Sequence, residues 1–423
     1  METTTRKTFI QRLLTPLLAI GPGIFAIGYT IGTGSVTSMV VAGSTYGMQL
    51  LWVLFLSCLF SWVLMEAYGR YYLVTGETAL YGFRKHLKFG NLIGVLIIIG
   101  ITIGQWNSLI GILGISANVI FETLSLFIPA IKSHEYLFVL VTAILIISGM
   151  YTLLWIGKYS LFEKVLIFFV SLMGLSFLLS LFIVFPDPKA ILGGLVPSIP
   201  EVAGGKMLVA AFVGTTMAAA TFLSRPLFIQ GRGWTKDNLK DQQKDALLAA
   251  VLIFCISGAI MAVSMAAFYE SGKTVVKVLD MVYALEPAAG RFAVAIFLLG
   301  TLGAGISSIF PILMIAPILI ADFQAGKLDT TSKQFKIIAG VACLIGLTVP
   351  LLGANPIQAQ ILSQVFNVFV LPLVIIGIMI LTNTKSLMGK HKAGPALNIG
   401  MALSLVFACI ISYNGILAIA EKL

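Results

Sequence analysis

The sequence contains little charge, because only 10% of its 423 residues are Asp, Glu, Lys or Arg. About a quarter of the residues of a soluble globular domain usually carry charge. The chain is instead 59% hydrophobic. This composition excludes an ordinary soluble domain and predicts an all-α integral membrane protein.

Histidine and cysteine are also scarce. The three histidines, His86, His134 and His391, lie in predicted loops, with no catalytic triad or metal-binding spacing around them. The four cysteines are isolated, each within an apolar run, and show no metal or redox spacing. We therefore expect neither an enzyme nor a bound cofactor.

Long hydrophobic runs, in contrast, recur along the whole chain. A membrane-spanning helix needs about 20 mainly apolar residues, with about 17 as a lower limit. Eleven such runs are present, at 14–41, 48–73, 92–127, 136–156, 162–185, 206–229, 246–269, 288–320, 337–354, 356–382 and 395–418. The polar connections 186–205, 230–245 and 270–287 are short enough to be loops. We therefore predict one transmembrane domain over residues 1–423.

The distribution of Lys and Arg predicts the orientation. Most of the 27 basic residues fall in connections on the same side as the N-terminus. The positive-inside rule assigns that side to the cytoplasm, and an odd number of helices places the C-terminus outside. The basic N-terminus lacks a small-residue cleavage site, so we expect an uncleaved first helix, in a bacterial cytoplasmic (cell inner) membrane. These loops explain the net charge of +10, so no nucleic-acid partner is expected, and the charged stretch 231–245 is interpreted as a solvated connection.

The first apolar run carries GYTIGTGS (28–35) at its centre, where lipid favours Leu and Ile. Irregular backbone at membrane depth is tolerated only where protein covers it or where it lines a cavity. Five helices later, GTTMAAAT (214–221) occupies the corresponding place. Interrupted helices at corresponding positions are typical of inverted-repeat transporters. The alternative for 214–221 is a small-residue face for close helix packing.

Several segments then resemble the Nramp family of divalent metal ion transporters. The most specific is QAQILSQVFNVFVLPLVIIGIMILTNTKSLMG (358–389), which is similar to the tenth helix and following loop of the family. Shorter resemblances, in the family's order, are AGSTYGMQLLWVLFLS (42–57), VTGE (74–77), FEKVLIFFVSLMGLSFL (162–178), GGLVPSIP (193–200) and AGISS (304–308). The resemblance implies a LeuT-like fold: helices 1–5 at 14–185 and helices 6–10 at 206–382 form the inverted repeat, and helix 11 at 395–418 is extra. It also implies secondary active transport through a site at mid-membrane, between helices 1 and 6.

The chain departs from the family at the metal site. Where the family has Asp-Pro-Gly-Asn in helix 1, this sequence has Gly32, Thr33, Gly34 and Ser35. Where the family has Met-Pro-His in helix 6, this sequence has 218–220, all alanine, although sliding the match by one residue restores Met217.

Three further positions can be compared with the family. Gln105 and Ser108 stand at the helix-3 positions where the family places an Asp and a Glu for proton passage. Only Gln364 keeps a residue that the family uses near the metal. The coupling ion, H⁺ or Na⁺, is left open.

Losing these ligands changes the expected substrate. A bare divalent cation at low dielectric needs carboxylates or other strong ligands, and neither broken helix contains Asp, Glu or His at its centre. A broken helix does leave unpaired N–H groups at the start of its second half, at the positive end of the helix dipole. Such an end favours anions. We therefore hypothesise a pocket for a small anion, a zwitterion such as an amino acid or carboxylate, or a neutral solute.

The candidate substrate-binding residues flank the two interruptions. The glycines permit close approach of the backbone, the alanines provide volume, and the hydroxyl and amide groups donate or accept hydrogen bonds. The set is Gly32, Thr33, Gly34, Ser35, Ala218, Ala219, Ala220, Thr221 and Gln364. For the three hydroxyl residues, the alternative is a hydrogen bond back to their own helix.

A polar pathway through Gln105, Ser108 and Arg225 is a further hypothesis. For Gln105 and Ser108, which share one helix face, hydrogen bonding between helices is the favoured role. Arg225 is predicted to snorkel to the cytoplasmic interface. Glu66 is predicted to pair with Arg70 four residues later.

Two alternatives to the anion or zwitterion transporter remain open. One is transport of a divalent metal cation, Mn²⁺ or hydrated Mg²⁺, bound by carbonyls, hydroxyls and Gln364. The other is a membrane sensor that binds without transporting. The glycine-rich first helix argues against a sensor, because a protein without moving parts could use a continuous and more stable helix.

Overall fold

The computed structural model describes residues 21–125, 127–184, 186–198, 205–269, 278–352 and 356–420. Every regular element in these ranges is a helix. Among the described residues, ten helices are long and apolar enough to span a membrane, and the number rises to eleven when the bent pair α2 (Gly23–Thr30) and α3 (Thr33–Tyr46) is counted as one span. The predicted all-α architecture of about eleven spans is confirmed, while the start of the first run, 14–20, lies outside the described residues.

The remaining spans follow the hydrophobic runs closely. They are α4 (Leu51–Thr75), α6 (Gly90–Ser125), α7 (Glu135–Ile156), α8 (Tyr159–Val184), the pair α10 (Gly205–Thr216) and α11 (Ala219–Arg232), α12 (Leu239–Ser264), α13 (Val278–Ala325), α14 (Lys333–Gly346) with α15 (Thr348–Leu352), α16 (Pro356–Val368) with α17 (Leu371–Asn383), and α19 (Pro395–Ala420). Short elements connect them: α5 (Ala79–His86), η1 (Pro129–His134), α9 (Pro188–Gly193), η2 (Lys236–Asn238), η3 (Met265–Tyr269), α18 (Lys385–Met388) and η4 (Gly389–His391).

Two boundaries differ from the prediction. Residues 278–287, predicted as part of a polar connection, already belong to α13, which is kinked at Gly290, where φ is 77°. The predicted continuous helix 356–382 is interrupted between α16 and α17. Pro372, at the start of α17, lacks the N–H that a continuous helix would need there.

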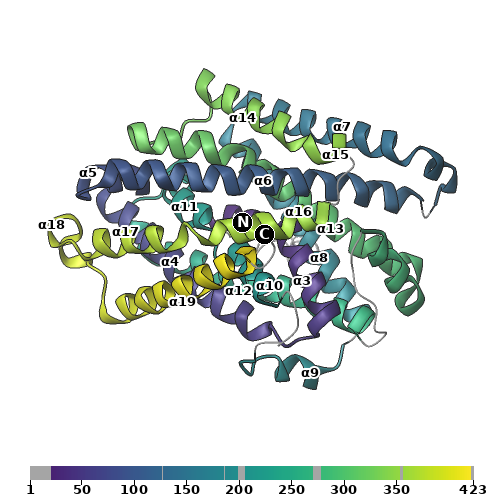
Figure 1. The fold of residues 1–423 in the computed structure, drawn as a ribbon. Coiled ribbons are helices and arrows are strands. Elements are labelled where there is room, and N and C mark those ends of the chain that lie inside the picture. The colour runs from purple at the N-terminus through teal and green to yellow at the C-terminus, as the bar shows by residue number, and fades with distance from the viewer. Residues whose placement is uncertain are drawn as a thin grey trace, which may run out of the picture.

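The broken helices occupy the middle of the bundle. The most apolar stretch of the α10–α11 span is entirely buried, whereas α7 and α19 are largely exposed on the outside. Figure 1 shows α6 crossing the molecule between α7 and α14 on one side and α17 and α19 on the other. The helix α13 packs along α6 and α8, and α12 packs along α3 and α4. The two spans that are broken at their centres, α2–α3 and α10–α11, are thus surrounded by the other helices.

Close packing explains the first break. The two halves α2 and α3 meet at an angle of 53°, and Gly32 between them is extended, with φ −91° and ψ −176°. A Cβ atom added at Gly32 would collide with Oγ and Cβ of Ser308 on α13. Glycine is therefore required where α13 crosses the break. The second break, at Met217 and Ala218, is milder, since α10 and α11 still form one span.

Two carboxylates fasten α5 to the ends of its neighbouring spans. Asp322 of α13 accepts hydrogen bonds from Thr78 and from the amide of Leu80, 3.1 Å away, at the start of α5. Glu77 accepts from Lys85 at 2.5 Å, from His86 at 2.6 Å and from Tyr71 at 3.1 Å. Burial alone would raise the pKa of Glu77, but these hydrogen bonds outweigh it and hold the pKa below its ordinary value.

Candidate functional site

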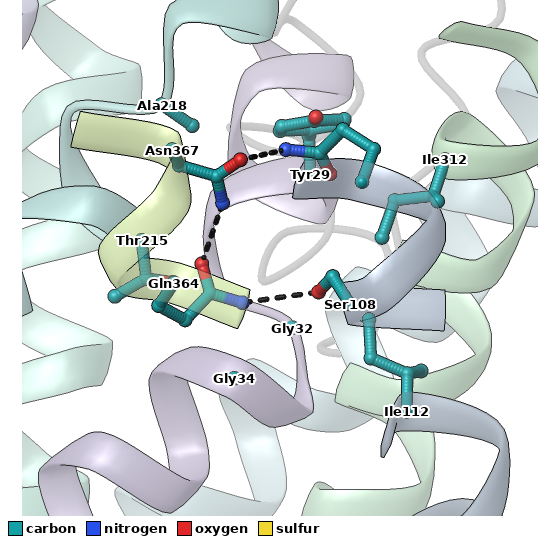
Figure 2. A pocket seen from close by; sticks show the side chains of 11 residues that line it. Tyr29, Gly32, Gly34, Ser108, Ile112, Thr215, Ala218, Ile312, Gln364 and Asn367 are labelled. Carbon is teal, nitrogen blue, oxygen red and sulfur yellow. Dashed lines mark hydrogen bonds between the residues drawn. The ribbon is translucent and has the colours of Figure 1, made fainter. Parts of the chain in front are cut away.

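A small pocket lies where the two interrupted helices meet α6, α13 and α16 (Figure 2). Its volume of about 10 Å³ is close to the space that one water molecule needs. The residues that line it are Tyr29, Gly32, Gly34, Gln105, Ser108, Ile112, Thr215, Ala218, Ile312, Gln364 and Asn367. Both breaks therefore contribute to one site.

Six of the predicted residues line this pocket: Gly32, Gly34, Ala218, Gln364, Gln105 and Ser108. They come from four separate parts of the sequence. The predicted association of both interruptions with Gln364 is thus present in the fold.

The other predicted residues lie nearby without lining the pocket. Ala219 and Ala220 are buried in the first turn of α11. The hydroxyls of Thr33 and Thr221 are buried and make no hydrogen bond within the described residues. Ser35 faces α12, with its Oγ atom 3.4 Å from Oγ of Ser257.

A chain of side-chain hydrogen bonds crosses one wall of the pocket. Gln105 donates to Oδ1 of Asn367 at 2.7 Å, and Asn367 donates to Oε1 of Gln364 at 3.0 Å. Gln364 and Gln360 in turn donate to Oγ of Ser108, at 3.0 and 2.9 Å. Figure 2 shows the part of this chain that passes through Asn367, Gln364 and Ser108. It ties α6 to α16, as expected for Gln105 and Ser108.

Sequence reasoning missed four polar residues of the site: Tyr29, Thr215, Gln360 and Asn367. Gln360 and Asn367 lie four residues before and three residues after Gln364, so all three share one face of α16. That spacing was the available signal. Tyr29 lines the pocket, and its hydroxyl is buried without a hydrogen-bond partner in the part of the chain that the structure describes.

The residues that line the pocket, within the described part of the chain, carry no formal charge. No Asp, Glu, His, Lys or Arg is among its lining residues, and the described residues contain no group of three or more His, Cys, Asp or Glu that could hold a metal ion. The helix ends supply partial charges of both signs: α3 and α11 begin at the breaks, and α2 and α10 end there. Thr215 joins the two negative ends by donating to the carbonyl of Thr30 at 3.2 Å.

The predicted position of Arg225 was wrong. Its residue surface is only 2% exposed, far less than that of a side chain snorkelling to an interface. It donates to Oδ2 of Asp245 at 2.7 Å and to Oε1 of Gln242 at 3.0 Å. Both partners lie on α12, in a stretch predicted to be solvated. Asp245 also accepts from the amides of Gly21 and Gly23, at 2.8 and 2.9 Å.

This network holds the start of α2 against α11 and α12. Asp245 supplies the acceptor that the first amides of α2 need, because the N-cap residue Pro22 makes no side-chain cap. The predicted pair of Glu66 and Arg70 is confirmed, at 2.7 Å. Glu66 also accepts from Gln242 at 3.2 Å, which connects α4 to the same network. The network therefore holds α2, α4, α11 and α12 together at one end of the bundle.

Comparisons with known proteins agree with this architecture. The family described as natural resistance-associated macrophage protein-like (Nramp) matches residues 23–418. The divalent metal cation transporter MntH of Vibrio campbellii is 26% identical over 389 residues, which cover 89% of this chain and 86% of that protein. The MntH of Aeromonas hydrophila is 24% identical over 433 residues, covering 96% of each chain.

Solved structures show the same fold. A mutant of the manganese transporter of Eremococcus coleocola superposes with a TM-score of 0.73 and 16% identity, over 100% of this chain and 89% of that one. MHP1, a nucleobase-cation-symport-1 family transporter, superposes with a TM-score of 0.56 and 13% identity, over 94% and 90%. The arrangement is the LeuT-like one, and because the family match extends from α2 into α19, this chain belongs to the Nramp family of membrane transporters.

Proposed function

We propose that this protein is a secondary transporter for a divalent metal cation that keeps part of its hydration shell. The observation that carries the proposal is the lining of the pocket, whose polar groups are all neutral amides, hydroxyls and backbone. Relatives of similar length are named divalent metal cation transporters, which supports a cation as the substrate.

Hydration decides which cation suits such a lining. Mg²⁺ loses its water reluctantly and usually keeps several water ligands when proteins bind it. The carboxamide oxygens of Gln364 and Asn367 each accept one hydrogen bond within the wall. A carbonyl oxygen has two lone pairs, so each oxygen can accept another bond, from a water of the ion. Hydrated Mg²⁺ is therefore favoured over a Mn²⁺ ion that has shed its water.

The size of the pocket requires movement. A space of about 10 Å³ holds about one water, and a hydrated ion needs several times this volume. The substrate can enter only when the interrupted helices separate from α6 and α16. Such movement of one part of the bundle against another is the alternating access of inverted-repeat transporters.

A small anion or zwitterion is the second candidate. The residues that precede α3 and α11, Gly32 and Ala218, make no side-chain cap. Two positive helix ends therefore meet at the pocket, which is the arrangement that suits a carboxylate. The names of the relatives give this candidate no support.

Transport into liposomes tests the two candidates. The purified chain would be reconstituted, and the uptake of Mg²⁺, Mn²⁺, amino acids and small organic acids measured under imposed H⁺ or Na⁺ gradients, which also identifies the coupling ion. We expect saturable Mg²⁺ uptake that falls at least about tenfold in Gln364→Leu, since removing one polar contact costs about 1.4 kcal/mol. Gln324→Leu, at an exposed position of α13, is the matched control and should transport normally.

Each alternative has a distinct result. Saturable uptake of a carboxylate compound without any cation uptake would replace the metal proposal by the second candidate. Binding of a ligand without uptake of any kind would favour a sensor.

A further inference from the structure

Two carboxamides of α16 meet at the single hydroxyl of Ser108 on α6. Nε2 of Gln364 and Nε2 of Gln360 donate to Oγ of Ser108, at 3.0 and 2.9 Å. All three side chains are buried. A hydroxyl oxygen has two lone pairs, so these two hydrogen bonds use both of them. Ser108 therefore cannot accept a further hydrogen bond from a substrate or from the water that surrounds it.

This convergence fixes which end of each carboxamide faces Ser108. A carboxamide has an oxygen end that accepts hydrogen bonds and a nitrogen end that donates them. A hydroxyl has two lone pairs but only one hydrogen. If both glutamines turned their oxygens towards Ser108, one oxygen would be bonded and the other would lie against a lone pair. Two nitrogen ends, in contrast, are both satisfied.

The rest of the pocket wall follows the same direction. Gln105 donates to Oδ1 of Asn367, and Asn367 donates to Oε1 of Gln364, which donates to Ser108 (Figure 2). Turning the carboxamide of Gln364 around would place its nitrogen against Nδ2 of Asn367. Asn367 and then Gln105 would have to turn as well to restore the bonds. The chain therefore reverses only as a whole, and Ser108 holds its last member.

Close packing encloses the nitrogen ends. A Cβ atom added at Gly34 would collide with Nε2 of Gln360 and with Nε2 of Gln364. The nitrogen ends thus lie between the backbone of α3 and Ser108 on α6. The oxygen of Gln364 lies instead towards Asn367, which also lines the pocket. The accepting end of Gln364 is therefore the one left for a substrate.

We propose that Ser108 is a positioning residue that sets the charge preference of the pocket, because it holds the nitrogen end of Gln364 and leaves the oxygen as an acceptor. This inference rests on the cation transport proposed above. Waters bound to a cation direct their hydrogens outward, so they need acceptors, whereas a carboxylate has no hydrogen and needs donors. Without the Ser108 hydroxyl, Gln364 can turn and present N–H groups to the pocket. The loss of one hydroxyl then favours an anion over a hydrated cation.

Uptake into liposomes tests this role with two variants, Ser108→Ala and Ser108→Cys. The thiol is similar in shape to the hydroxyl, but its sulfur is only a weak acceptor, so Ser108→Cys removes the hydrogen bonds without leaving a cavity. We expect both variants to raise the half-saturating Mg²⁺ concentration about tenfold. Acetate should inhibit Mg²⁺ uptake more strongly in both variants than in the wild type. A purely structural role would lower the amount of active protein and would leave the response to acetate unchanged.

The matched control is Ser116→Ala. Ser116 is also buried on α6, but it does not line the pocket, and its hydroxyl makes no hydrogen bond within the described residues. This variant should keep the wild-type half-saturating Mg²⁺ concentration and the wild-type response to acetate.

A second measurement needs no substrate. The thermal midpoint of Ser108→Ala would be compared in the wild-type background and in Gln360→Leu/Gln364→Leu. In the wild-type background the midpoint should fall, because two buried N–H groups lose their acceptor. In the double-variant background the same substitution should lower the midpoint much less, because residues in one hydrogen-bond network are coupled.

The outcomes separate this inference from the proposed function. A wild-type protein that takes up no divalent cation would refute the proposed function, and the thermal midpoints would then decide alone whether Ser108 holds the glutamines. Normal Mg²⁺ uptake that neither Ser108 variant changes would overturn the inference and leave the proposed function intact. An equal fall of the midpoint in both backgrounds, or an effect of Ser116→Ala on Mg²⁺ uptake as large as that of Ser108→Ala, would also overturn it.

Discussion

Replacing Asp245 by Asn tests whether the buried network keeps one end of the bundle closed. The variant preserves the size of the side chain and one acceptor oxygen for the amides of Gly21 and Gly23. It removes the charge that Arg225 faces at 2.7 Å. The expected effect is weaker attachment of α2 to α11 and α12.

The size of the expected shift between the closed and the open state follows from the burial of the ion pair. The side chains of Arg225 and Asp245 are 1% and 4% exposed. Removing one partner of a buried ion pair typically costs about 3–5 kcal/mol, because the other charge stays buried without compensation. When this end of the bundle opens, water can reach Arg225. The cost of its uncompensated charge is therefore paid mainly in the closed state. A cost of about 3 kcal/mol would therefore shift the equilibrium towards the open state on the order of 100-fold.

Cysteine accessibility measures this shift. In a variant without the native cysteines, Ser224→Cys places a thiol beside Arg225, where the native side chain is buried. We expect the rate of maleimide labelling at position 224 to rise on the order of 100-fold when Asp245→Asn is added. A second reporter, Ser116→Cys, replaces a buried side chain on α6 and should stay unlabelled unless the whole protein unfolds.

The matched control is Asp241→Asn, one turn earlier on α12, because Asp241 is exposed and outside the network. If Asp245→Asn and Asp241→Asn label at the same rate, the ion pair does not hold the closed state. Equal labelling at positions 224 and 116 would indicate global unfolding and would equally refute the reasoning.

Three further predictions concern packing, selectivity and pH. Gly214→Ala should lower the thermal midpoint, because its Cβ would collide with the backbone carbonyl of Gln364 and overpacking costs about 1–3 kcal/mol; Gly149→Ala, which meets nothing within 4 Å, should not lower it. Gln364→Glu places a carboxylate in the pocket, so Mn²⁺ should inhibit Mg²⁺ uptake at lower concentrations than in the wild type. Because the pKa of Glu77 is depressed, its ionised form stabilises the fold fully above the ordinary carboxylate pKa, and this contribution is lost as the pH falls from that value through the depressed pKa. Glu77→Gln should therefore lower the thermal midpoint at pH 7, and the difference should vanish in acid.

The spans and the first break could be predicted because each depends on local sequence. A helix in lipid needs a fixed length of apolar residues, so the runs marked the spans closely. The glycines of 28–35 marked the break, and Gly32 is indeed the residue that leaves room for Ser308. The break between α16 and α17 was missed, because a proline in a hydrophobic run is also compatible with a continuous kinked helix.

The partners of buried polar groups depend on how distant helices align, and the sequence does not show this alignment. Arg225 looked like an interfacial residue, because its partner Asp245 stands 20 residues later in a charged stretch. That stretch turns back as α12 and buries Asp245 against α2 and α11. The spacing on α16 could have placed Asn367 on the face of Gln364, but it could not show that Gln105, 262 positions away, donates a hydrogen bond to it.

The charged side chains near the interrupted helices pair with one another at a distance from the pocket. The neutral lining that remains constrains which substrate can bind. Arg225 lies seven residues after Ala218 on α11, about 10 Å along the helix, and is paired with Asp245. At the pocket itself, the positive ends of α3 and α11 oppose the negative ends of α2 and α10. A bare divalent ion would give up the large free energy of its hydration there and meet no opposing charge in return. An ion that keeps its inner waters gives up much less, and these waters can donate to the carboxamides of Gln364 and Asn367. For the cation transport that we propose, we therefore expect the site to favour the cation that holds its water most strongly, and introducing a carboxylate at position 364 should shift the preference towards ions that lose water more easily.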